Sequence, residues 1–125
     1  MIATADRIRA DDVGMIVAHG KGTANSDASE ARALQRVFGA DMPPVTAFKW
    51  ALGHTIAAAG ILETALALEA LARGTVPGVA NLARLDPACA GVCVSGAAQQ
   101  PRSKVALILC RGFAGTNAAL VVRAA

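Results

Sequence analysis

Two glycine-rich turns, each preceded by a short strand-like segment, hold the two histidines of this chain. His19 stands in Ala-His-Gly-Lys-Gly-Thr at residues 18–23, and His54 ends Lys-Trp-Ala-Leu-Gly-His at residues 49–54. In α/β folds, turns at the carboxyl ends of strands present side chains to ligands. The pattern therefore predicts alternating strands and helices, with one histidine beyond each of two strands.

Short apolar runs bounded by turn residues predict the strands. These runs lie at residues 13–18, 45–48, 92–95, 104–110 and 118–123. A tight glycine turn joins the last two, so they are expected to be antiparallel neighbours.

Helical periodicity separates these strands. Residues 1–10 have helical composition, and a helix is expected from a capping box, Asp27 to Glu30, as far as Gly39. Residues 55–73 predict a second, almost wholly apolar helix, and residues 74–87 a loop. The expected fold is α/β: a mixed five-stranded sheet layered with helices, in one domain over residues 1–125.

Composition limits the classes of function. Hydrophobic residues make up 54% of the 125 residues, so we expect part of the surface to be buried against another chain or segment. The net charge of +3 comes from scattered residues, which gives no basis for nucleic-acid binding. The first residues are charged and lack an apolar signal core, which favours a cytoplasmic protein. The apolar stretch 56–71 is too short to span a membrane and contains Glu63 and Glu69.

Metal and phosphate sites find little support. Cys89, Cys93 and Cys110 form no CxxC pair and have no matching histidine spacing, so no disulfide framework, metal site or cofactor is expected. Each cysteine is expected to be a small buried side chain. Residues 20–23 resemble a phosphate-binding loop only superficially, because they do not fit GxxxxGK[ST].

The two histidines are the first candidates for chemistry. A neutral imidazole beside glycine can donate a hydrogen bond to a carbonyl oxygen, and two of them could share one developing negative charge. The alternative is that each ring only satisfies the loop backbone.

Two further candidates lie nearby in the sequence. Lys49 follows an apolar strand, where its charge would need a partner, and Glu63 within the apolar helix could supply it. Alternatively, Lys49 reaches solvent and Glu63 lies on an exposed helix face. Backbone N–H groups of residues 112–117 could form one side of an oxyanion hole, or the segment could be only a hairpin turn.

Three motifs in order resemble the C-terminal half of a β-ketoacyl-acyl-carrier-protein synthase. They are Ala-His-Gly-Lys-Gly-Thr, Lys-x4-His continuing as Gly-His-Thr-x-Ala-Ala-Ala-Gly, and Gly-Phe-x-Gly-Thr-Asn, within residues 13–122. The resemblance implies a thiolase-like fold of two related α/β halves in a five-layered sandwich, usually dimeric. Residues 1–125 would be a C-terminal ketosynthase-like domain, and the missing nucleophile-bearing half would account for the excess of apolar residues.

By this resemblance, the two histidines would bind a malonyl thioester carbonyl and stabilise the enolate formed on decarboxylation. The enolate would attack an acyl chain carried on a cysteine of the N-terminal half, in fatty acid or polyketide synthesis, with acyl carrier protein as partner. Phe113 matches a gating phenylalanine whose N–H contributes to the oxyanion hole. The implied catalytic residues are His19, His54 and Lys49, and the supporting ones Glu63, Phe113, Gly115 and Thr23.

The chain departs from the family pattern at three positions: Lys21 replaces a usual threonine, Trp50 a small residue and Arg111 an aromatic residue. Three functions stay open. The chain could complete an active synthase, or it could be a catalytically inactive partner subunit of the chain-length-factor type. The third is a thiolase-type acyltransferase, in which Cys110 of Cys-Arg-Gly would act as acid and base.

Overall fold

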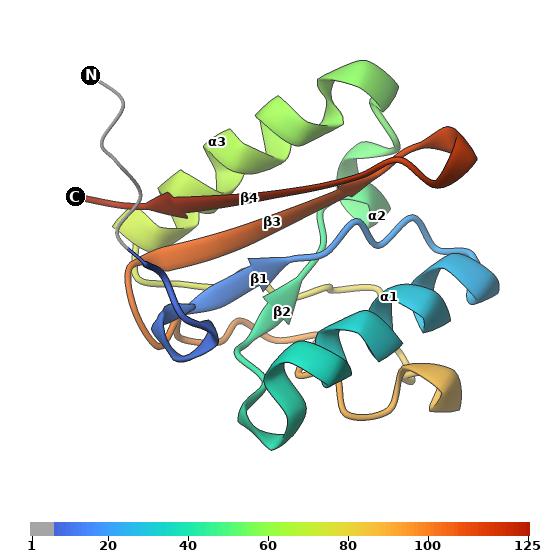
Figure 1. Ribbon diagram of the computed structural model, residues 1–125, viewed down its shortest axis with the longest axis horizontal. Coiled ribbons are helices and arrows are strands. Elements are labelled where there is room, and N and C mark those ends of the chain that lie inside the picture. The colour runs from blue at the N-terminus through green and yellow to red at the C-terminus, as the bar shows by residue number, and fades with distance from the viewer. Residues whose placement is uncertain (1–6) are drawn as a thin grey trace.

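The computed structural model describes residues 7–125 and consists of three layers, a sheet between two helices (Figure 1). The sheet has four strands in the order β2-β1-β3-β4. The strands are β1 (Met15–Val17), β2 (Val45–Thr46), β3 (Val105–Arg111) and β4 (Asn117–Arg123). The helices are α1 (Ala24–Phe38), α2 (Lys49–Leu52) and α3 (Ala59–Ala72). Short 3-10 helices lie at Ala10–Asp12, Gly39–Asp41, Ile56–Ala58, Pro87–Cys89 and Phe113–Gly115.

The sheet is mixed, as the sequence predicted. Strand β1 pairs in parallel with both β2 and β3, and β3 pairs antiparallel with β4, from Val105 opposite Arg123 to Arg111 opposite Asn117. β1 therefore lies inside the sheet, and its carboxyl end delivers His19 between neighbouring strands.

Alternation along β1 divides the core between the two faces of the sheet. Met15 and Val17 pack with α3, whereas Ile16 packs with α1 on the opposite face. All three side chains are fully buried. Two helices on opposite faces of a sheet explain why β1 is apolar at every position rather than at every second one.

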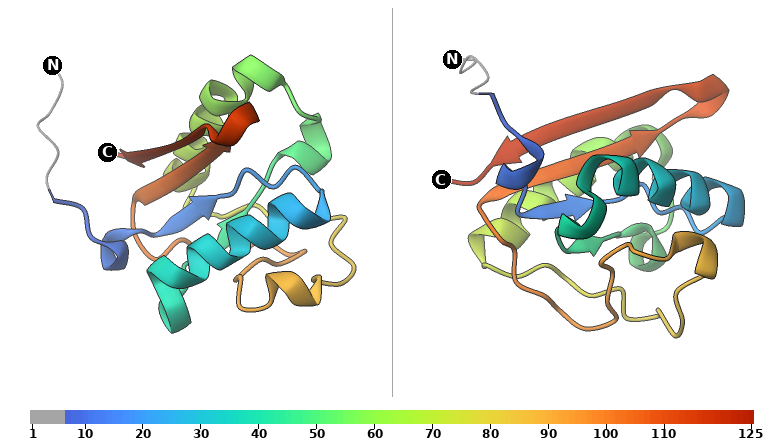
Figure 2. Two further views of the ribbon diagram at one scale, coloured as in Figure 1. Left: turned by 45° about the vertical axis from the view of Figure 1, so that its right-hand side comes forward. Right: turned by 60° about the horizontal axis from the view of Figure 1, so that its bottom comes forward.

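The predicted fifth strand is wrong. In residues 92–95 only Val94 pairs, through an isolated parallel bridge to Val45. Strand β2 has only two residues, so its outer edge offers too little backbone for a longer ladder. This part of the long α3–β3 connection instead passes beside α1 and β2 (Figure 2), where the Gln35 side chain donates to the Ala90 carbonyl oxygen.

Helix starts also differ from the prediction. Helix α1 begins at Ala24 after Thr23, before the proposed capping box, and it ends at Gly39 as expected. The helix predicted over 55–73 begins with the 3-10 helix Ile56–Ala58. Of the helix predicted over 1–10, residues 1–6 lie outside the described residues, and 7–9 have no regular structure.

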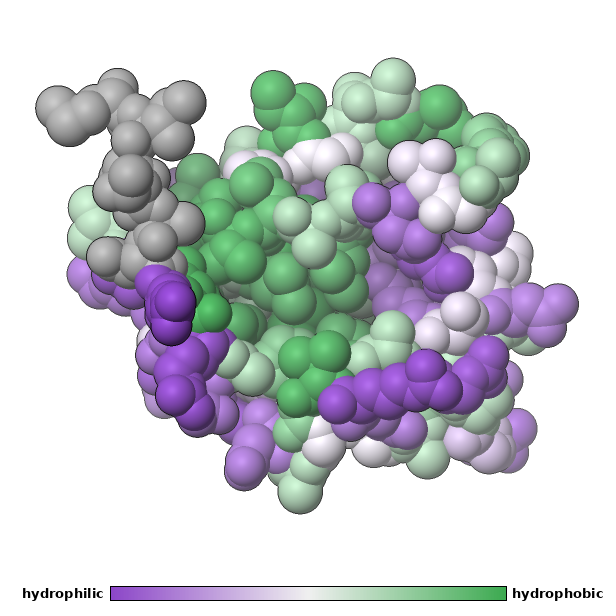
Figure 3. Space-filling view, viewed as in Figure 1, coloured by the Kyte–Doolittle hydropathy of each residue, from purple (hydrophilic) through white to green (hydrophobic). Residues whose placement is uncertain are grey.

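Apolar side chains remain exposed along β4 and α3. Leu120 is 49% exposed, and Ile61 is 77% exposed. Figure 3 shows an apolar area over the β3–β4 side of the molecule, next to a hydrophilic region. Within residues 7–125, no helix has the length and apolarity needed to cross a membrane.

Candidate active site

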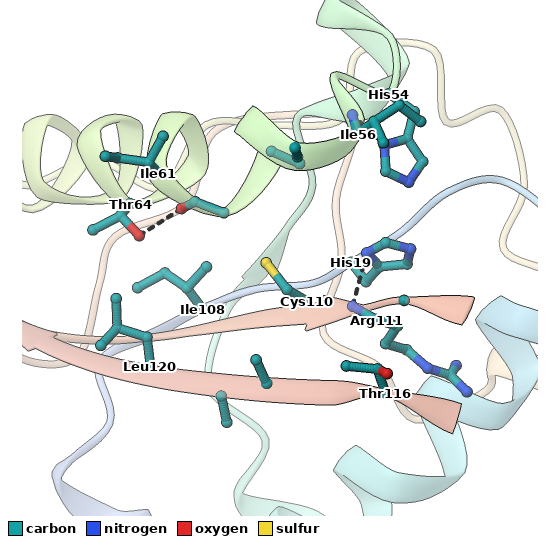
Figure 4. Close-up of a pocket in the computed structure, with 16 residues that line it drawn as sticks. His19, His54, Ile56, Ile61, Thr64, Ile108, Cys110, Arg111, Thr116 and Leu120 are labelled. Carbon is teal, nitrogen blue, oxygen red and sulfur yellow. Dashed lines mark hydrogen bonds between the residues drawn. The ribbon is translucent and has the colours of Figure 1, made fainter. Parts of the chain in front are cut away.

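The two histidine rings lie together at the carboxyl end of β3 (Figure 4). His19 follows β1 and is 3% exposed, whereas His54 follows α2 and is exposed. Their ring centroids are 5.3 Å apart, and the ring planes are at 76°. The structure thus brings together two side chains that are 35 residues apart in the sequence.

The backbone next to His19 determines which ring nitrogen carries its proton. The Arg111 N–H donates to His19 Nδ1 over 3.3 Å. A backbone N–H can only donate, so the neutral ring carries its own hydrogen on Nε2. Burial lowers the pKa of His19 to about 4, assisted by the nearby charge of Lys49. At neutral pH, His19 is therefore a neutral Nε2–H donor.

His54 is held in the same tautomer by its own turn. The Ile56 N–H donates to His54 Nδ1 over 3.1 Å, which leaves Nε2–H as the donor. Ile56 has φ 52°, a left-handed conformation that is uncommon for a β-branched residue. The turn therefore keeps an unfavourable backbone conformation in the same residue that orients His54.

Glu30 holds the His19 turn from the opposite side. Its carboxylate accepts from the His19 N–H over 2.7 Å and from the Gly20 N–H over 3.1 Å. Gly20 has φ 45°, and a Cβ there would lie 2.7 Å from the Ala47 Cβ, so the turn needs glycine. Burial raises the pKa of Glu30, although both backbone hydrogen bonds lower it.

This role of Glu30 differs from the one predicted from the sequence. The capping-box interpretation treated its side chain as part of a helix terminus, but α1 starts six residues earlier. A signal was present: Glu30, Leu34 and Phe38 recur every four residues, and all three are buried on one face of α1. An acidic residue on a buried helix face requires hydrogen-bond donors, and the His19 turn supplies them.

Lys49 and Glu63 form a buried ion pair between α2 and α3, the pairing that the sequence suggested. Their side chains are 5% and 3% exposed, so Glu63 does not lie on an exposed helix face. Lys49 itself begins α2 rather than directly ending a strand. The pair places the charge of Lys49 near His19, where it helps to keep that ring neutral.

The thiol of Cys110 lies on the other side of Glu63. Its Sγ donates a long contact of 4.0 Å to Glu63 Oε2. Burial raises the pKa of Cys110, and the charge of Glu63 adds to the effect. The thiol is therefore protonated at neutral pH, and this position does not generate a nucleophilic thiolate.

Of the other supporting residues predicted from the sequence, only Phe113 lines a cavity together with the histidines. The turn of residues 112–117 closes through the Gly112 N–H, which donates to the Thr116 carbonyl oxygen over 2.8 Å. Phe113 at its tip is 90% exposed and borders a cavity that both histidines also line. Thr23 immediately precedes α1, and Gly115 has φ 78° in the turn; neither lines the histidine cavities among the described residues. A contribution of the Phe113 N–H to an oxyanion hole stays a prediction.

Two cavities meet at the histidines. One, of about 710 Å³, runs between α3 and the β3–β4 hairpin and is lined mainly by apolar residues, among them Ile61, Ile108 and Leu120 (Figure 4). The other, of about 550 Å³, lies toward α1 and is lined mainly by polar and basic residues. The imidazoles thus stand between an apolar space and a polar one.

A third cavity of about 260 Å³ lies behind the His19 turn, and Trp50 lines it. Trp50 is 41% exposed on α2, and neither of the two histidine cavities includes it. In residues 7–125, no three histidine, cysteine or acidic side chains are grouped closely enough to hold a metal ion.

The lowered pKa of His19 predicts an acid-dependent stability. The unfolded ring has a pKa near 6.5 and the folded one a pKa of about 4, so between these values the unfolded state binds more protons. The contribution of His19 is complete above pH 6.5 and is lost as the pH falls toward 4, by on the order of 3 kcal/mol. Urea unfolding at a series of pH values should show this loss. His19→Gln should lack it; an equal slope in this variant would contradict the prediction.

Comparison with known proteins gives the context of this site. Residues 2–83 match the family model described as "Beta-ketoacyl synthase, C-terminal domain". The chain is 38% identical over 119 residues to actinorhodin polyketide putative beta-ketoacyl synthase 1 of Streptomyces coelicolor, covering 94% of this chain and 26% of that protein.

Solved structures agree with this match. The ishigamide ketosynthase/chain length factor is 31% identical to this chain, with a TM-score of 0.83. The match covers 94% of this chain and 29% of the chain in that structure. The complex AntDE:AntF, a type II acyl carrier protein with its ketosynthase bound to the hexaketide, matches at 30% identity and a TM-score of 0.86, with the same coverage.

The chain therefore spans little more than a quarter of the length of the proteins it matches. Its fold is that of a thiolase-like ketosynthase segment, with four strands rather than the five predicted. The resemblance seen in the three sequence motifs is confirmed, and the chain belongs to the β-ketoacyl synthase C-terminal domain family.

Proposed function

We propose that this chain supplies the decarboxylation half of a β-ketoacyl synthase active site. The Nε2–H groups of His19 and His54 would donate to the thioester carbonyl oxygen of a malonyl-type group. As the bond to the carboxylate breaks and carbon dioxide leaves, its electron pair forms the enolate, and the negative charge develops on that oxygen. The observation that carries the proposal is the pair of Nδ1 hydrogen bonds, which leave both Nε2–H groups available for this charge.

The buried Lys49–Glu63 pair would support these donors. Its positive end disfavours a second positive charge on His19, so the ring stays neutral in the tautomer that donates from Nε2. Lys49 is paired with Glu63, and its proposed contribution is the electrostatic field it exerts at His19.

Carbon–carbon bond formation needs an acyl group on a cysteine, which we propose is supplied by a segment outside this chain. Cys110 is an unsuitable nucleophile because its thiol is partly buried and its pKa is raised. The exposed apolar residues of β4 and α3 offer the surface for such a segment or subunit. An acyl carrier protein would present the substrate; the AntDE:AntF complex pairs such a carrier with its ketosynthase.

A catalytically inactive partner subunit is the second candidate. It is favoured by the departures at Lys21, Trp50 and Arg111 and by the similarity to a ketosynthase/chain length factor structure. Two neighbouring imidazoles in the same tautomer favour an active site, because a purely structural subunit has no use for a strained turn that orients His54. The same raised thiol pKa disfavours the thiolase-type reaction through Cys110.

Reconstitution with a cysteine-bearing ketosynthase half tests the proposal. The chain is joined to, or co-expressed with, an N-terminal half from a relative, and malonyl-carrier decarboxylation and condensation are both measured. We expect both activities in the assembled protein and neither in either part alone. A correctly folded assembly that neither decarboxylates nor condenses would contradict the proposal.

A further inference from the structure

Two of the departures from the family pattern meet in one cavity. Lys21 and Arg111 are separated by 90 positions in the sequence, yet both line the cavity of about 550 Å³ next to the histidines. By the resemblance, the family has a threonine and an aromatic residue at these positions, whereas this chain has two positively charged side chains. Two such changes that converge in space call for a common explanation.

The charged side chains that line this cavity are positive. Its polar lining consists of Lys21, Arg111, the two histidines, Asn25, Ser26 and Ser29, without a carboxylate among the described residues. Across residues 7–125 the ion pairs are Lys49–Glu63 and Arg73–Glu69, and neither involves this cavity. The carboxylates of Asp27 and Glu30 interact electrostatically with Arg111, and that of Asp27 also with Lys21, but among the described residues neither forms an ion pair with these side chains.

The guanidinium of Arg111 is positioned and still has donors to spare. Nη1 donates to the Ser26 carbonyl oxygen over 2.8 Å, and Nη2 donates to Ser29 Oγ over 3.2 Å. Both acceptors are neutral, and these two bonds use two of the five N–H groups of the side chain. Contacts with α1 thus restrict the guanidinium and leave further N–H groups for a ligand, and Arg is suited to binding carboxylate or phosphate oxygens.

From this arrangement we propose that Lys21 and Arg111 form an anion subsite that binds a carboxylate or phosphate group of the ligand whose carbonyl reaches His19 and His54. The subsite rests on the proposed function only in assigning the carbonyl to the histidines. It makes the substrate class more specific: a thioester ligand that also carries a carboxylate or a phosphate group. Exposed Lys21 would contribute a mobile charge, and Arg111 an oriented one.

The histidines also provide a built-in reporter. The positive charges of Arg111 and Lys21 are among the causes that lower the pKa of His19. A bound anion acts in the opposite direction and should raise it. Because the chain has two histidines, their ring resonances can be followed separately by NMR.

Binding is tested by titrating the full chain with malonate and, separately, with inorganic phosphate, while the ring resonances are recorded. We expect saturable shifts for the wild-type chain, with binding about tenfold weaker in Lys21→Thr and in Arg111→Phe. Arg111→Lys should retain more affinity than Arg111→Phe. The matched control is Lys104→Thr, which removes the same charge as Lys21→Thr. Lys104 precedes β3 at the end opposite Arg111 and is therefore distant from the subsite.

The two probes distinguish the source of the anion. Saturation by malonate alone supports a carboxylate of the ligand, and saturation by phosphate alone supports a phosphate group of the ligand. Absence of saturation by both, or equal weakening by Lys104→Thr, would overturn the subsite. If Arg111→Phe does not fold, Lys21→Thr and Arg111→Lys still decide the question. The titration measures anion binding and not condensation. A negative titration therefore does not contradict the proposed function, and an assembly that fails to condense does not contradict the subsite.

Discussion

Alanine at His54 is expected to lower the decarboxylation rate of the assembled synthase about 100- to 1,000-fold, because it removes one preoriented donor to the developing oxyanion. His54 is exposed and contributes little to the core, so the variant should fold normally. His19→Ala should show a loss of similar size, although its buried ring also makes a structural contribution. The measurement is release of carbon dioxide from a malonyl carrier by the reconstituted protein.

The control for this prediction is His54→Gln, which keeps an N–H donor in a side chain of similar reach and should retain part of the rate. Circular dichroism and assembly with the partner half should be unchanged in each variant. Full activity in both alanine variants would mean that the chain serves as a catalytically inactive partner subunit.

Removal of either member of the Lys49–Glu63 pair is expected to have the largest effect on stability. Lys49→Ala leaves the buried carboxylate of Glu63 without its partner, which should cost about 3–5 kcal/mol in the free energy of unfolding. Lys49→Met combined with Glu63→Leu removes both charges and should cost much less. Urea unfolding of the folded chain or assembly measures all three proteins.

A second ion pair in the same molecule supplies the comparison. Arg73 and Glu69 are bonded over 2.6 Å, but their side chains are 74% and 59% exposed. Arg73→Ala should therefore cost less than about 1 kcal/mol. If Lys49→Ala destabilised the protein no more than Arg73→Ala, burial would not determine the contribution of the pair. Lys49→Ala should also raise the pKa of His19, because the positive charge nearby is lost.

The sequence was a reliable guide where local patterns coincide with the final structure. The antiparallel β3–β4 hairpin was predictable because two apolar runs flank one glycine turn. The end of α1 was predictable because glycine readily adopts the positive φ that ends a helix, as Gly39 does here. The residue types and the order of the three motifs were sufficient to identify the family, which the comparisons confirm. The pairing of Lys49 with Glu63 was predictable because a charge in an apolar environment needs a partner.

Other features depended on residues that are distant in sequence. Residues 92–95 have strand-like composition, but the neighbouring strand β2 has only two residues. It forms a single β-bridge with them, between Val45 and Val94. The role of Glu30 required knowing that the His19 turn lies against its face of α1. The convergence of Lys21 and Arg111 required the end of β3 to lie beside the turn that follows β1.

The order of residues establishes which groups are available for chemistry: two histidines beside glycines, a lysine with an acidic partner, and a glycine turn. Their chemical state depends on the packing of distant segments. The Arg111 and Ile56 backbone N–H groups select the imidazole tautomers, and burial keeps His19 neutral. Residue type sets which protonation states a side chain can have, whereas the local dielectric and hydrogen-bond partners set which one it adopts, and these arise only when distant segments pack together.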